Sequence, residues 1–335
     1  MQEKGGLKDF CISEDNPYLA KAYRQDNYRV IMNNPDKKTC FIFFSGNGIY
    51  YPDTVEEFHQ TIEVKDRYEW ERTARSPQIQ RMAGKIILIR DLYKTWYQAG
   101  INDKINSIEK VLELLQKLCR GYEVITCGNS AGGYMAALAG VYLNAKCVFD
   151  FSGQWSLPMW LPEQTMKKHP FLVQKQAIGE DRWFDIVPFA TNNATPIFWF
   201  YSGQCDRDLI QADCLAGCKE NSNICVFPMK SQEHGFNVLG GSVEYLLEQT
   251  PEFLQTYRKK HSANLEEHNT TQEEHNTTQE KHSTNQEKLI SLRKLCFGIM
   301  PFWLAVKEVW KDIVRCHKSL QILTQAGKKR RAGKQ

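Results

Sequence analysis

Residues 122–140 read YEVITCGNSAGGYMAALAG, and this stretch gives the strongest indication of the fold. Its apolar start, around Val124 and Ile125, predicts a strand, while residues 134–143 are rich in alanine, methionine and leucine, which favour a helix. Between them lies a Gly-x-Ser-x-Gly turn with Ser130 at its centre. A strand, a sharp turn and a helix form the context in which this pattern indicates a nucleophile elbow. The alternative is an ordinary surface loop.

Apolar strand candidates alternate with helical stretches on both sides of this turn. That alternation is typical of a parallel sheet covered by helices. One stretch, residues 106–119, has its apolar residues at clear helical spacing. The sequence therefore predicts an α/β fold over residues 1–259, with a mostly parallel central sheet and helices on both faces. The strand candidates are 28–32, 41–44, 85–90, 123–126, 146–151, 196–201 and 224–227, with a further weak one around Phe10.

A serine hydroxyl is a poor nucleophile until a base removes its proton, so a histidine must reach it. Of the eight histidines, four lie in a repeat near the C-terminus and His317 lies in the tail. His59 and His169 fall away from the expected end of the sheet. His234 directly follows the strand candidate 224–227, where a loop would deliver a catalytic base. A structural or surface histidine is the alternative for this position.

The base in turn needs an acid that holds its tautomer. Asp206 and Asp208 both follow the strand candidate 196–201. Asp206 completes a Gly-x-x-Asp turn that starts at Gly203, which favours it as the acid. Asp208 is the alternate acid, since a carboxylate is common in the first turn of a helix. The order serine, aspartate, histidine along the chain is that of α/β-hydrolases.

Acyl transfer also requires an oxyanion hole. The backbone N–H of Ala131, the residue after the predicted nucleophile, supplies one donor by this geometry. The second should come from the glycine-containing loop after the strand candidate 41–44, where Gly46 and Asn47 are the candidates. An ordinary tight turn is the alternative for this loop.

A long segment rich in tryptophan, proline, methionine and lysine, about residues 155–189, separates two strand candidates and is expected to form a cap. Trp155, Trp160 and Trp183 are candidates for stacking on a sugar ring of the substrate. Packing in the interior of the cap is an equal alternative for all three.

The C-terminal quarter differs in kind. Residues 260–286 carry a heptapeptide repeat whose two perfect copies, EEHNTTQ, contain no apolar residue, so a coiled coil is not expected. We expect a mobile or disordered linker and no metal site. Residues 287–335 are amphipathic and end in a basic tail. This segment suits a membrane surface or a glycan-assembly partner, with packing against the protein's own core as the alternative.

Bulk composition limits the class of protein. The formal net charge of +4 over 335 residues does not call for a specific nucleic-acid partner. Eleven cysteines, an odd number, and the lack of a secretion signal fit a cytoplasmic protein, peripheral on the inner face of the membrane if residues 287–335 bind it. No apolar run is long enough to predict a transmembrane helix.

The motifs GNSAGG, SGQCD and EHGF resemble those of the α/β-hydrolase superfamily over residues 8–259. Within it, the short elbow rich in asparagine and serine, with its paired glycines, resembles that of cytoplasmic enzymes of the bacterial capsule O-acetyltransferase type. The lack of a secretion signal is similar as well. This resemblance implies acyl transfer through an acyl-Ser130 intermediate, with acetyl-CoA as co-substrate, a carbohydrate acceptor and no bound cofactor. A carboxylesterase or deacetylase is the alternative enzyme. A non-catalytic scaffold of a glycan-assembly complex is the alternative outside enzymes.

Overall fold

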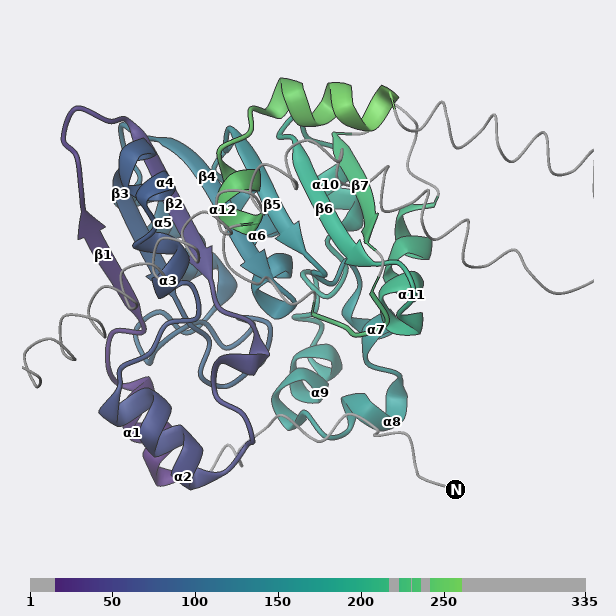
Figure 1. The fold of residues 1–335 in the computed structure, drawn as a ribbon. Helices are drawn as coiled ribbons and strands as arrows, with labels where there is room; N and C mark the ends of the chain where they lie inside the picture. The colour runs from purple at the N-terminus through teal and green to yellow at the C-terminus, as the bar shows by residue number, and fades with distance from the viewer. Residues whose placement is uncertain (1–15, 217–222, 230, 236–241, 261–335) are drawn as a thin grey trace, which may run out of the picture. The chain divides into compact units, whose positions relative to one another are not determined.

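A computed structural model describes residues 16–216, 223–229, 231–235 and 242–260 of the chain. Its centre is a seven-stranded sheet in the order β1-β3-β2-β4-β5-β6-β7 (Figure 1). Every neighbouring pair is parallel except β1 and β3, which are antiparallel. The strands are β1 Tyr28–Met32, β2 Thr39–Phe44, β3 Ala83–Ile89, β4 Glu123–Asn129, β5 Cys147–Phe151, β6 Ile197–Ser202 and β7 Ile224–Met229.

This sheet confirms the predicted α/β class with a mostly parallel central sheet, and each of the seven strand candidates is in place. The weak candidate around Phe10 lies outside the described residues, as do the repeat from residue 261 onward and the amphipathic segment 287–335. The domain boundaries proposed for that region therefore stay predictions.

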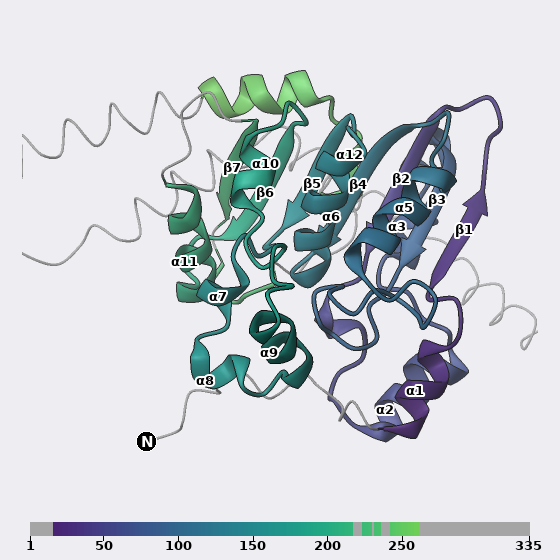
Figure 2. The same cartoon turned by 180° about the vertical axis from the view of Figure 1, so that it is seen from behind.

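Helices cover both faces of the sheet, as the two opposite views show (Figures 1 and 2). The helices are α1 Pro17–Tyr23, α2 Val55–Phe58, α3 Glu71–Ala74, α4 Pro77–Met82, α5 Ile108–Leu118, α6 Ala131–Tyr142, α7 Leu157–Trp160, α8 Glu163–Met166, α9 Pro170–Ala177, α10 Val187–Thr191, α11 Asp206–Leu215 and α12 Ser242–Leu247. Residues 251–260 are helical as well. The loop after β2 forms a short 3-10 helix, Asn47–Ile49, and a π-helical turn spans His59–Val64.

The surroundings of strand β2 explain why its sequence is apolar without interruption. Its alternate residues Ile42 and Phe44 pack in one core with α5 and α6. Phe43 faces the other way and stacks on Trp70, with the ring centroids 5.7 Å apart. A strand between two layers of helices is buried on both faces, so it has no polar side. Helix α6 is likewise buried along almost its whole length, which explains its alanine- and glycine-rich sequence.

The glycines of the GNSAGG turn let β2, β4 and α6 approach one another. A Cβ atom on Gly128 would lie 2.0 Å from the carbonyl oxygen of Gly132. A Cβ atom on Gly132 would lie 2.2 Å from the carbonyl oxygen of Phe44. Because these contacts are with backbone, no side-chain rotation can relieve them.

We therefore expect Gly128→Ala to lower the free energy of unfolding by about 3 kcal/mol, because the added methyl group forces strand and helix apart. The control is Gly48→Ala, because a Cβ atom there meets nothing within 4 Å. Urea unfolding followed by circular dichroism measures both variants. Equal unfolding midpoints for the two variants would contradict the close packing of the turn.

The predicted cap leaves the sheet after β5 and returns before β6. Its two ends pair with each other at its base: Leu157 N–H donates to the Phe184 carbonyl at 2.7 Å, and Ile186 N–H donates to the Trp155 carbonyl at 3.0 Å. Buried Gln211, on α11, accepts the N–H groups of Trp155 and Ser156 at 2.7 and 2.9 Å. The excursion between these contacts carries α7, α8 and α9, and it is anchored to the helix that follows β6.

Candidate active site

Ser130 occupies a strained turn between β4 and α6. Its backbone has φ 54° and ψ −122°, a region that residues with a side chain rarely adopt. The Ser130 N–H donates to the Phe151 carbonyl at 2.8 Å, which ties the turn to the end of the neighbouring strand β5. Strain of this kind persists only where the surrounding structure enforces it, and it is concentrated at functional sites. The turn thus has the backbone geometry expected of a nucleophile elbow.

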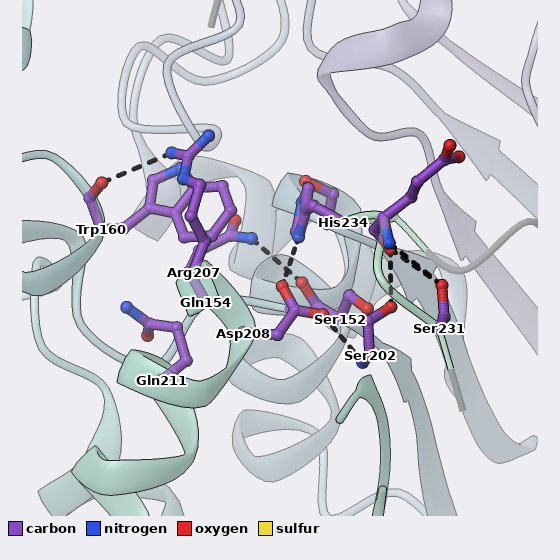
Figure 3. A network of polar contacts seen from close by, with 12 residues as sticks. Ser152, Gln154, Trp160, Ser202, Arg207, Asp208, Gln211, Ser231 and His234 are labelled. Carbon is purple, nitrogen blue, oxygen red and sulfur yellow. Dashed lines mark hydrogen bonds and ion pairs between the residues drawn. The ribbon is translucent and has the colours of Figure 1, made fainter. Parts of the chain in front are cut away.

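Three side chains from three separate segments of the chain form one hydrogen-bonded chain. Ser130 Oγ lies 2.8 Å from His234 Nε2, in the loop after β7. His234 Nδ1 lies 2.5 Å from Asp208 Oδ1, at the start of α11 (Figure 3). The Asp208 side chain is 2% exposed and that of His234 is 21% exposed. With Nδ1–H donating to the carboxylate, Nε2 is left to accept the Ser130 proton.

It is Asp208, and not Asp206, that lies against His234. The preference for Asp206 is corrected by this contact, which Asp208, the alternate acid, makes instead. Asp206 is the first residue of α11 and is exposed, whereas Asp208 is buried. Successive residues of an α-helix are rotated by about 100°, so residues two apart point to nearly opposite sides. The turn from Gly203 therefore runs directly into a helix, and the second aspartate of that helix is the one that faces inward.

Buried Ser202, at the end of β6, connects the acid to the loop of the histidine. Its N–H donates to Asp208 Oδ2 at 2.9 Å, so both oxygens of this carboxylate are occupied. Its hydroxyl donates to the carbonyl of Glu233, the residue before His234, at 2.7 Å. Ser202 could not be identified from the sequence, because a lone serine at a strand end carries no recognisable pattern.

We expect Ser202→Ala to lower kcat/KM for a simple acetyl ester about fivefold. Loss of one buried hydrogen bond frees the loop that aims His234, and such a bond is worth about 1 kcal/mol. The matched control is Ser231→Ala, because Ser231 donates to the same Glu233 carbonyl from an exposed position at 3.2 Å. Initial rates of ester hydrolysis compare the two. An equal loss in both variants would rule out a special role for Ser202.

The predicted oxyanion loop lies beside the elbow, since Gly132 closely approaches the end of β2. Ala131 begins α6, so its N–H lies in the first turn, where a helix has no internal acceptor. The Gly46 N–H is already bonded to Glu69 Oε2 at 2.5 Å, which removes Gly46 as a free donor in this structure. Asn47 begins the 3-10 helix and holds the loop through its amide, which donates to the Lys94 carbonyl at 3.3 Å.

Glu69 is an unexpected acid at this point. Burial raises the pKa of its carboxyl, against the opposing effect of hydrogen bonds from the Gly46 N–H and the Asn129 side chain. Asn129 directly precedes Ser130, so Glu69 joins the oxyanion loop to the elbow. The sequence around Glu69 does not predict this contact, because Gly46 and Glu69 are 23 positions apart in the chain.

The three predicted substrate tryptophans lie in different surroundings. Trp155 is fully buried and packs edge-on against Trp199, so its ring is not accessible to a sugar, which corrects that prediction. Trp183 is half-buried and donates through Nε1 to Glu109 at 2.7 Å. Of the three, Trp160 is the one whose ring contacts His234, with the centroids 4.4 Å apart.

The other described histidines lie apart from this arrangement. His59 pairs with Glu63 at 2.7 Å on an exposed turn, and His169 packs edge-on against Trp96. Within the described part of the chain, no cluster of three or more histidine, cysteine, aspartate or glutamate side chains is suited to hold a metal ion. No helix among those same residues has the length and apolar character needed to cross a membrane.

No family model and no curated protein matches the chain. Several solved structures have a similar fold. The capsule O-acetyltransferase of Neisseria meningitidis serogroup A is 14% identical, over 70% of this chain and 92% of that chain, with a TM-score of 0.45. A protein of unknown function from Staphylococcus aureus is 13% identical, over 68% and 93%, with a TM-score of 0.43. The fluorophosphonate-binding serine hydrolase FphF of Staphylococcus aureus is 11% identical, over 69% and 95%, with a TM-score of 0.38. At this level the likeness concerns the fold and does not identify an activity or a substrate.

Proposed function

We propose that the chain is a serine-dependent acyl-transfer enzyme that works through an acyl-Ser130 intermediate. The observation that carries this proposal is the continuous hydrogen-bonded chain from Ser130 through His234 to buried Asp208. Each member has the surroundings that its role requires: a strained turn for the nucleophile, a loop for the base, and a buried, doubly bonded carboxylate for the acid.

In the first half-reaction, Ser130 Oγ attacks the acyl carbonyl carbon while His234 Nε2 takes the serine proton. Asp208 keeps the imidazole in the required tautomer and stabilises the imidazolium that forms. The carbonyl oxygen becomes an oxyanion, and we assign its stabilisation to the N–H groups of Ala131 and Asn47. Collapse of this intermediate breaks the bond to the leaving group, which takes the proton from His234 and leaves acyl-Ser130.

In the second half-reaction, an acceptor hydroxyl attacks the acyl-Ser130 carbonyl and gives its proton to His234. The second tetrahedral intermediate expels Ser130, which takes that proton back. The acceptor is either water or an alcohol, and the same three side chains serve both outcomes. Transfer and hydrolysis differ in how well the site excludes water, not in the catalytic residues.

We further propose acetyl-CoA as the donor and a hydroxyl of a bacterial surface polysaccharide as the acceptor. The support for this finer proposal is the resemblance of the sequence motifs, together with an anchored cap that brings a tryptophan against His234. Hydrolysis of an acyl ester of a glycan or small molecule is the alternative. The cytoplasmic location and a membrane or glycan-assembly partner through residues 287–335 belong to the same proposal and concern residues outside the described ones.

Incubation of the full chain with acetyl-CoA carrying a labelled acetyl group tests the donor and acceptor together. We expect release of free CoA that depends on an added polysaccharide, with the label recovered in that polysaccharide as an ester. Release of CoA with the label recovered only as acetate, for every glycan tried, would favour the hydrolase. Mass spectrometry of the peptide containing Ser130 detects the acetyl-enzyme in either case.

A further inference from the structure

Beside His234 stands a stack of side chains that the proposed catalytic steps do not use. The Trp160 ring contacts the imidazole of His234, and the Arg207 guanidinium lies over the same tryptophan ring, with Cζ 3.5 Å from its centroid (Figure 3). Trp160 comes from the cap and Arg207 from α11, so the stack joins the cap to the helix that carries Asp208.

The positive charge of Arg207 is poorly compensated. Its one hydrogen bond to another described residue runs from Nη2 to the Trp160 carbonyl and is long, at 3.5 Å. No carboxylate of the described residues forms an ion pair with it. Asp208, the acidic group that acts on it electrostatically, has both oxygens bonded to His234 and Ser202. Two further acidic residues are close in the sequence: Asp206 precedes Arg207, and Glu233 precedes His234. Both are exposed to solvent.

Burial disfavours the charged form of this side chain. Desolvation lowers the pKa of Arg207 to about 10, although the neighbouring Cys205 and Asp208 act in the opposite direction. A guanidinium has five N–H donors in a planar fork, which suits two-point binding of a phosphate or a carboxylate. Stacking on an aromatic face holds that fork in one orientation and leaves its N–H edge available for such an anion.

The position of the stack decides which part of a substrate it would meet. His234 must pass its proton to the leaving group, so the leaving group lies on the His234 side of the scissile bond. An acceptor alcohol must give its proton to the same nitrogen and therefore approaches from the same side. Trp160 and Arg207 lie on this side too, because the Trp160 ring contacts the imidazole itself.

We propose that Arg207, held by Trp160, binds a phosphate or carboxylate group on the leaving-group or acceptor half of the substrate. This inference rests on the proposed acyl-transfer function and narrows its substrate class to anionic molecules. In both cases the bound group is a phosphate or carboxylate whose oxygens accept hydrogen bonds from two N–H groups of Arg207. Its source is either the donor, as a phosphate of a thioester carrier, or the acceptor, as a charged group of a glycan.

A matched pair of esters tests the proposal. 4-Acetoxybenzoate and its methyl ester carry the same acetyl group and differ in one negative charge on the leaving group. We expect Arg207→Gln to lower the ratio of kcat/KM for the charged ester to that for the neutral ester about tenfold or more, mainly through KM. Arg207→Lys keeps the charge without the planar fork and should fall between wild type and Arg207→Gln.

Arg182→Gln is the matched control, because Arg182 also lies over a tryptophan, 4.2 Å from the ring centroid of Trp183, but pairs with Glu109. We expect this variant to keep the wild-type ratio. An unchanged ratio in Arg207→Gln would overturn the proposal, whatever happens to the two absolute rates. An equal fall of the ratio in Arg182→Gln would overturn it as well, since any surface cation would then suffice.

If the esters are not turned over, that failure counts against the proposed acyl-transfer function and not against the anion site. A binding measurement then tests the anion site directly. Calorimetric titration of wild type and Arg207→Gln with CoA and with glucose 1-phosphate, and with methyl glucoside as the neutral control, needs no turnover. Weaker binding of CoA alone would assign the anion to the donor, and weaker binding of the sugar phosphate alone would assign it to the acceptor. Equal affinities of both proteins for both anions would overturn the proposal.

Discussion

Ser130→Ala is expected to abolish covalent labelling by a fluorophosphonate probe and to lower kcat for ester hydrolysis by about four to six orders of magnitude. The probe reacts with an activated serine hydroxyl, and no other described serine lies against His234 in a strained turn. Once the oxygen is removed, no acyl-enzyme can form, and the residual rate comes from substrate binding and oxyanion stabilisation alone. Gel fluorescence and stopped-flow rates measure the two effects.

Ser152→Ala is the control for this experiment. Ser152 also has a positive φ, 52°, follows the neighbouring strand β5, and is 2% exposed. Its N–H, like that of Ser130, donates to the end of the next strand, at the Phe200 carbonyl. We expect Ser152→Ala to keep its labelling. Labelling of folded Ser130→Ala at the wild-type level would refute the catalytic proposal and favour the scaffold.

Asp208→Asn is expected to lower kcat about ten-thousandfold, whereas Asp206→Asn should change it by less than about threefold. An amide in place of the buried carboxylate no longer holds Nδ1–H or stabilises the imidazolium, so His234 loses its function as a base. The two residues lie in the same turn of α11, which makes them a matched pair. Steady-state kinetics on a simple acetyl ester decides between them.

Circular dichroism and a thermal melt show whether each aspartate variant is folded, so that lost activity is not confused with lost structure. A severe defect in Asp206→Asn with a mild one in Asp208→Asn would mean that the acid reaches His234 in an arrangement other than the one described. Equal and small defects would remove the aspartate from the mechanism altogether.

The strands of the sheet and its mostly parallel character could be predicted from the sequence because their causes are local. Strand β4 is apolar, the glycines of GNSAGG are small where β4 and α6 pass closely, and α6 is rich in helix-forming residues. Buried parallel strands are apolar without alternation, and this pattern is visible in β2, β3, β4 and β6. His234 and the two candidate acids followed from their places after strands.

Three features of the site could not be predicted in this way. The choice between Asp206 and Asp208 depends on where α11 begins, and sequence reasoning does not fix a helix boundary to the residue. The bridge from Ser202 to Glu233 joins residues 31 positions apart. The stack of Arg207 on Trp160 depends on how the cap is anchored to α11, which no spacing in the sequence expresses.

The α/β sheet, the strained turn at Ser130 and the histidine that reaches it could therefore be predicted, because they depend on short-range patterns of apolar residues and glycines. Three contacts became known from the three-dimensional structure: Asp208 holds His234, Glu69 occupies the Gly46 N–H, and Arg207 and Trp160 lie beside the imidazole. The physical reason is that hydrogen bonds and ring contacts depend on the direction of each side chain. That direction is set by helix phase and by the packing of segments far apart in the chain.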